Sequence, residues 1–159
     1  MITNSLLDLQ AGELDDLLPL VGLGLDLLAE ALGRLDQRIA TELDQIIESV
    51  KQNANATYRG SYLFSGTKTD TLPYQQGAVD TYAGDLAGLD PATPGVLREI
   101  GPGVTMSINT VGREFLGDGS GAADDKLLDT LRSAAVALRA DDAATLRDTS
   151  LGRLDANLD

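Results

Sequence analysis

The feature that most constrains this chain is the regular spacing of leucine and isoleucine in its N-terminal part. Apolar residues fall at positions 25, 28, 32, 35 and 39, and after one slip of four they resume at Leu43, Ile46 and Val50. Alternating steps of three and four residues are typical of an α-helix with a coiled-coil-like apolar edge, and the slip is a stutter. We therefore predict a long helix over roughly residues 25–56, with a shorter helix around 5–18 because Pro19 lies between them.

The C-terminal segment carries a matching apolar pattern. Leucines and an alanine at helical spacing predict one helix after Asp124 and a second after Asp141, each aspartate serving as an N-cap. Ordering a backbone costs about 1–2 kcal/mol per residue, so a long helix needs a partner to pack on. We expect the two chain ends to form an elongated antiparallel helical bundle, or rod. Its predicted seam consists of Leu28, Leu32, Leu35, Ile39, Leu43, Ile46, Val50, Leu131, Leu138, Leu146 and Leu154.

The middle of the chain has a different character. The segments "GAVDTYAGD", "GVLREIG" and "GVTMSINTVG" are rich in Val, Ile, Tyr and Thr and are bounded by glycine and proline. This pattern is typical of short strands joined by turns. We predict an α+β protein in which residues 1–59 and 118–159 form a discontinuous helical rod domain. Residues 60–117 form β-hairpins and a small β-rich insert.

Composition excludes several classes of function. The formal net charge of −13 argues against binding to nucleic acid or to anionic membrane surfaces. The apolar run "LLPLVGLGL" is too short to span a bilayer, so we predict no membrane insertion. The chain has neither cysteine nor histidine, which removes the thiolate nucleophile, the commonest general base and the commonest metal ligands.

Other candidates for chemistry have simpler explanations. The acidic pairs at 15–16, 124–125 and 141–142 stand at predicted helix starts, where aspartate caps the helix and favours its dipole. Ser65 and Ser120 have no histidine to activate them, and "GDGSG" lacks the spacing of a phosphate-binding loop. We therefore predict no catalytic residue, no cofactor site and no metal site, and we expect that the protein is not an enzyme.

The strip "GSYLFSGTKTDTLPY", residues 60–74, holds three of the six aromatic residues of the chain. Tyr62 and Phe64 alternate with Leu63 as in a strand, and the glycines at either side permit turns. Pro73 and Tyr74 begin the next extended piece. From these residues alone we predict a strand pair that is buried near the end of the long helix.

The run from Ile39 to Tyr74 resembles the flagellin family, and most closely its hook-associated members at the junction of hook and filament. In that family the long N-terminal helix ends in an Ala-Asn element, followed by Gly-x-Tyr-Leu-Phe-x-Gly and by a strip that ends in Pro and an aromatic residue. A Tyr-Ala-Gly-Asp element here matches the next one. The matching residues are Asn55, Gly60, Tyr62, Leu63, Phe64, Gly66, Pro73, Tyr74, Tyr82 and Gly84.

The resemblance implies a structural protein of the bacterial flagellum that acts by self-assembly. It also implies an extracellular location, reached through type III export without a cleaved signal peptide. Expected partners are the first hook-associated protein, flagellin, an export chaperone, and further copies in the full-length protein. Family motifs expected at both ends are missing, so we expect a fragment without the terminal polymerisation helices. Two alternatives are flagellin itself, and a secreted adhesin or partner-binding module on a helical stalk.

Overall fold

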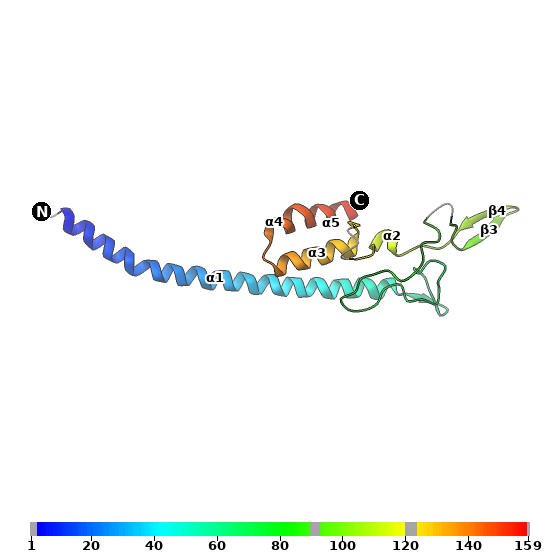
Figure 1. Ribbon diagram of the computed structural model, residues 1–159, viewed down its shortest axis with the longest axis horizontal. Helices are drawn as coiled ribbons and strands as arrows, with labels where there is room; N and C mark the ends of the chain where they lie inside the picture. Colours follow the sequence, from blue (N-terminus) through cyan, green and yellow to red (C-terminus); the bar gives the residue numbers. More distant parts are fainter. Residues whose placement is uncertain (1–2, 90–92, 120–123, 159) are drawn as a thin grey trace. The chain divides into compact units, whose positions relative to one another are not determined.

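The computed structural model describes the backbone of residues 3–89, 93–119 and 124–158, and side chains from residue 18 onward within these ranges, except at 149, 157 and 158. Helices are combined with two small antiparallel sheets, which confirms the predicted α+β class (Figure 1). In chain order the elements are α1 (Thr3–Ala54), β1 (Thr57–Tyr58), β2 (Ser61–Tyr62), β3 (Leu97–Gly101), β4 (Val104–Ser107), α2 (Arg113–Leu116), α3 (Leu127–Arg139), α4 (Ala143–Thr145), the π-helical turn η1 (Leu146–Ser150) and α5 (Leu151–Leu158).

The first element, α1, is one helix of 52 residues that continues through Pro19. The prediction of two helices separated near this proline was therefore wrong. A proline removes one backbone hydrogen bond and crowds the preceding turn, which can kink a helix without ending it. The leucines on either side of Pro19 are good helix formers and favour continuation.

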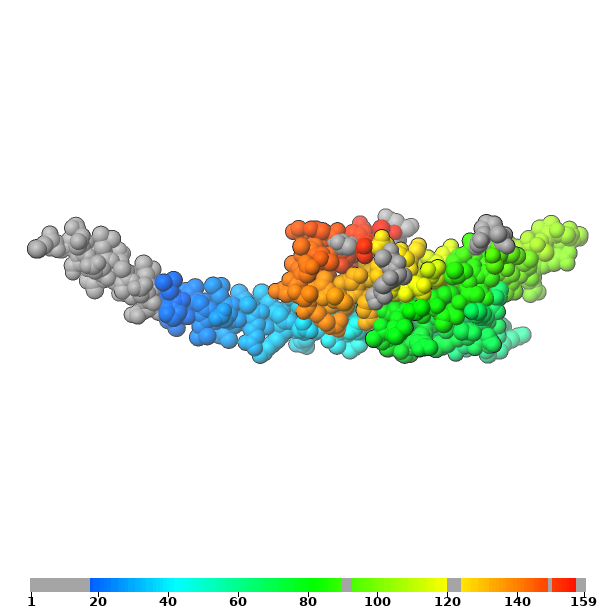
Figure 2. Space-filling view, viewed as in Figure 1, coloured from blue at the N-terminus to red at the C-terminus, as the bar shows by residue number. Residues whose placement is uncertain are grey.

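By its internal contacts the chain divides into one unit that ends at Arg38 and another that begins at Ile39. In the second unit, α1 lies antiparallel to α3. Ala40 packs near Leu138 at the end of α3, and Ile47 packs near Leu128 and Leu131 at its start. Figure 2 shows this part of α1, in cyan, in contact with α3, in orange.

The buried edge of α1 differs from the predicted seam by one position. Leu43 and Val50 pack as expected, but Ala40 and Ile47 are buried whereas Ile39 and Ile46 are exposed. Ala40 faces Ala135, and two small side chains allow the helix backbones to approach closely. Of the remaining seam, Leu131 and Leu138 are buried, and Leu146 and Leu154 pack at the side of the core.

In the first unit the predicted seam has no packing partner among the described residues, because Leu28, Leu32 and Leu35 are exposed. The described helices therefore form a bundle within the second unit and not a rod along the whole of α1.

Each sheet is a single hairpin. β1 and β2 pair Thr57 with Tyr62 and Tyr58 with Ser61, and the two turn residues, Arg59 and Gly60, both have positive φ, as a type I′ turn requires. β3 and β4 pair from Leu97 with Ser107 to Gly101 with Val104, with a bulge between.

The strand predicted over residues 77–85 was wrong. Its only described pairing is one bridge between Tyr74 and Tyr82, because its backbone and Asp80 bond instead to side chains of α1 and α3.

Candidate functional site

Asn55, the residue that follows α1, holds the aromatic strip against the end of the helix. Its side-chain amide donates to the Tyr74 carbonyl over 2.7 Å, and its carbonyl oxygen accepts the Tyr74 N–H over 2.9 Å. This pair of bonds imitates a strand pairing between residues 19 positions apart. It satisfies both backbone groups of Tyr74, which is fully buried.

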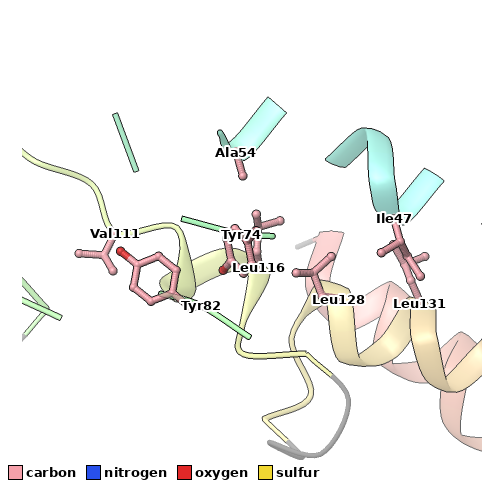
Figure 3. Close-up of a cluster of buried hydrophobic side chains, with 8 residues drawn as sticks. All are labelled: Ile47, Ala54, Tyr74, Tyr82, Val111, Leu116, Leu128 and Leu131. Carbon is pink, nitrogen blue, oxygen red and sulfur yellow. The ribbon is translucent and has the colours of Figure 1, made fainter. Parts of the chain in front are cut away.

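Tyr74 and Tyr82 form the centre of the site, with their ring centroids 5.4 Å apart (Figure 3). The Tyr74 hydroxyl donates to the Gly117 carbonyl over 2.7 Å, and the Tyr82 hydroxyl donates to the Phe64 carbonyl over 2.8 Å. Val111 and Leu116 complete the apolar surroundings. The two tyrosines thus connect α1, the strip and the segment before α3 through one buried cluster.

Burial also determines how these tyrosines ionise. Loss of solvent raises the pKa of Tyr82 to about 12, with a further contribution from the nearby carboxylate of Asp85. Burial likewise raises the pKa of Tyr74 far above its ordinary value. Both phenols therefore stay protonated at neutral pH and serve as hydrogen-bond donors.

Gly66 and Gly84 are required where backbones approach each other. A Cβ added at Gly66, whose φ is +71°, would collide with Asp85, and a Cβ at Gly84 would collide with the ring and hydroxyl of Tyr82. Asp85 accepts bonds from the backbone and hydroxyl of Thr67. Burial acts to raise the pKa of this carboxyl, but the hydrogen bonds outweigh it and lower the pKa overall.

The Tyr-Leu-Phe part of the strip is less buried than predicted. Tyr62 and Phe64 are half-buried and Leu63 is exposed, whereas Ser65, Pro73 and Tyr74 are buried. The ring of Phe64 meets that of Phe115 edge to face at 5.8 Å. Together with residues of α1 and α2 they line an apolar groove of about 230 Å³, formed by Val50, Asn53, Ala54, Phe64, Phe115 and Leu116.

An ion-pair network that the sequence analysis missed lies beside this core. Lys51 of α1 is fully buried, and its ammonium group donates to the Gly77 carbonyl over 2.6 Å. It also pairs with Asp80 at 3.0 Å and with Glu48 at 2.8 Å. Lysine is rarely buried, so nothing in its type suggested this role. Its position gave no signal either, because Lys51 lies one turn after Ile47, on an edge of α1 that the predicted seam did not include.

Arg132 of α3 completes the network. Its guanidinium binds both carboxylate oxygens of Asp80 at 2.8 Å and reaches Asp44 of α1 at 2.7 Å. The side chain of Asp80 is almost fully buried between Lys51 and Arg132, so its charge is balanced on both sides. The loop from Gly77 to Asp80 is thereby attached to two helices at once.

The predicted helix caps are displaced. Asp124 accepts from the N–H groups of Asp118 and Lys126, but the N-cap of α3 is Lys126. Asp142, not Asp141, caps α4 by accepting the Thr145 N–H over 2.9 Å.

Asp124 and Asp142 bond to backbone N–H groups, and buried Asp80 pairs with Lys51 of α1 and Arg132 of α3. Within the part of the chain that the structure describes, no group of three or more acidic side chains is arranged to hold a metal ion.

A scan against protein-family models gave no match, and a search of curated proteins gave no significant match. The flagellin resemblance therefore depends only on the sequence motifs named above. In the described ranges, no helix combines the length and the apolar character needed to cross a bilayer.

Proposed function

We propose that the protein is a structural component of the bacterial flagellum, placed between hook and filament, and that it acts through protein–protein contacts without catalysis. The observation that carries this proposal is the role of the family-like residues. Asn55, Tyr74 and Tyr82 are the residues that join the end of α1 to the loops that follow it. An assembly protein needs residues that hold its fold together, and it does not need a catalytic centre.

The finer architecture belongs to the same proposal. An antiparallel rod formed by the helices of both chain ends, limited to the second unit, is supported by the packing of α1 against α3 there. The balanced Lys51–Asp80–Arg132 network also supports it, because buried ion pairs favour one register of packing over others. In this proposal the protein is exported with a chaperone and contacts the first hook-associated protein, flagellin and its own copies.

Two other functions fit particular observations. Flagellin itself belongs to the family that the run from Ile39 to Tyr74 resembles, although the strip and the short β insert are closer to the hook-associated members. A secreted adhesin or partner-binding module is favoured by the β3–β4 hairpin, where alternation places Val104 and Met106 on one face and both side chains are exposed. A two-stranded hairpin is only marginally stable in water, which favours a partner on that face.

Immunogold labelling of the source cells with antibody to this chain separates these functions. We expect gold at the boundary between hook and filament. Gold along the whole filament would instead identify flagellin. Gold on the cell surface away from flagella, or no labelled flagella, would contradict the flagellar proposal and favour the adhesin.

A further inference from the structure

The first unit of the chain presents an apolar helix face that nothing described in the structure covers. Six residues of α1 follow one another at steps of three and four, so they lie on one face, in the blue part of α1 in Figure 1. Each side chain is between 51 % and 65 % exposed. Contiguous exposed apolar surface of this kind marks an interaction site. We call these residues the exposed stripe: Leu18, Val21, Leu25, Leu28, Leu32 and Leu35.

The described helices of the same chain have no free stripe to match it. The apolar side of α3 is used in the second unit, where Leu128, Leu131 and Leu138 are buried. In α5, Leu154 packs at the side of that core. A helix with unused apolar residues at the same spacing is therefore best supplied by another molecule.

The positions beside the exposed stripe are small. Gly22 and Ala29 flank it on one side, and Gly24 and Ala31 flank it on the other. A Cβ added at Gly22 or Gly24 would meet nothing within 4 Å, so the approach to the stripe is open. The surface ion pair of Glu30 and Arg34 lies away from the stripe, on the outer side of the helix. Small flanking residues allow a second helix to come close.

The stripe is complementary to itself when a second copy is reversed. We infer that residues 18–35 of α1 pair with the same residues of a second copy as an antiparallel coiled coil. In one register Leu25 lies against Leu28 of the second copy, Val21 against Leu32, and Leu18 against Leu35. Each layer occurs twice because of the two-fold symmetry. All six stripe residues are used over about 27 Å of helix, and no polar side chain enters the interface.

Charge favours the antiparallel direction. No lysine or arginine precedes Arg34, while six acidic residues occur up to Glu30. A parallel pair would align these acidic segments with each other. An antiparallel pair places Arg38 of one copy beside the acidic residues around position 15 of the second copy, where opposite charges attract. This pairing is independent of the flagellar proposal, since it concerns contacts in solution and not location.

A matched pair of variants tests whether the stripe carries the association. Leu27 and Leu28 are neighbours with nearly equal exposure, 59 % and 56 %, but only Leu28 belongs to the stripe. We expect sedimentation equilibrium of the full chain to show a dimer. Leu28→Asp should raise its dissociation constant about tenfold or more, because it places a charge in an apolar interface. Leu27→Asp should change the dissociation constant far less. Circular dichroism should show that the two variants have equal helix content. A monomeric parent chain, or equal weakening by both substitutions, would overturn the inference.

Disulfide trapping tests the direction and the register. The chain has no cysteine, so Val21→Cys and Leu32→Cys each introduce a single thiol. In the antiparallel register a mixture of the two variants should form the mixed disulfide dimer on mild oxidation. Neither variant alone should cross-link, because two copies of the same position are separated by about 16 Å along the helix. Cross-linking of each variant with itself would indicate a parallel pair, and no cross-linking would place the contact elsewhere. Either result would refute the antiparallel register.

Discussion

At the scale of single residues, Tyr82 shows how the buried cluster depends on protonation. Its hydroxyl donates to the Phe64 carbonyl, a role that the phenolate cannot fill. The folded pKa is raised above the ordinary value of 10.0 to about 12, so the folded state binds the proton more tightly than the unfolded state does. The contribution of Tyr82 to stability is therefore complete below pH 10 and is lost as the pH rises toward 12.

The raised pKa of Tyr82 in the folded state leads to a prediction for Tyr82→Phe. At neutral pH the substitution should lower the free energy of unfolding by about 1 kcal/mol, because the Phe64 carbonyl loses its donor. Between pH 10 and pH 12 the variant should lose less stability with rising pH than the parent chain, since one group with a raised pKa has been removed. Urea denaturation at a series of alkaline pH values measures both effects. Parallel decline of the two proteins would show that Tyr82 does not titrate with the fold.

At the scale of elements, the buried ion pairs determine how the loop before Tyr82 is held between α1 and α3. Asp80 lies between Lys51 and Arg132, and removing either cation leaves a buried carboxylate short of a partner. Such a loss costs more than a surface ion pair contributes, because the remaining charge is not solvated.

We therefore predict that Lys51→Met lowers the free energy of unfolding by about 3–5 kcal/mol. Arg34→Met is the matched control, because it breaks an exposed ion pair on the same helix and should change stability by no more than about 1 kcal/mol. Chemical denaturation of both variants, monitored by circular dichroism, gives the comparison. Similar small losses in the two variants would mean that the buried network is no stronger than a surface pair.

At the scale of the whole molecule, the described core lies within the second unit. The buried apolar residues run from Ala40 to Leu138, whereas the described apolar side chains before Arg38 are exposed. Residues 39–159 should therefore hold their own structure without the first unit.

We predict that a chain beginning at Ile39 melts within a few degrees of the full chain when both are dilute. The reason is that the deletion removes no side chain of the described core. Differential scanning calorimetry measures the two melting temperatures. A large drop on truncation would reveal contributions to the core from before Ile39.

Much of the helix content was predictable from local patterns, because helix formation depends on propensity and spacing within a few turns. The spacing identified α1 and α3, and the glycine-bounded strips identified the β3–β4 hairpin. The site was predictable in its residues but not in their burial. Tyr74 and Tyr82 belong to the buried core and Asn55 bonds to Tyr74 beside it, yet Phe64 lies half-buried at a surface groove. Lys51 was missed because its burial depends on Asp80 and on Gly77, which are distant in the sequence.

The sequence by itself determined that α1 is helical and which of its sides are apolar, since both follow from neighbours along one chain. Only the tertiary structure decided which apolar residues are buried. Two adjacent edges of α1 have the required spacing, one through Ile39 and Ile46 and one through Ala40 and Ile47. The edge with Ala40 is buried because the small side chain of Ala40 lets α3 approach. Which of two neighbouring edges becomes buried therefore depends on the helix that packs against α1.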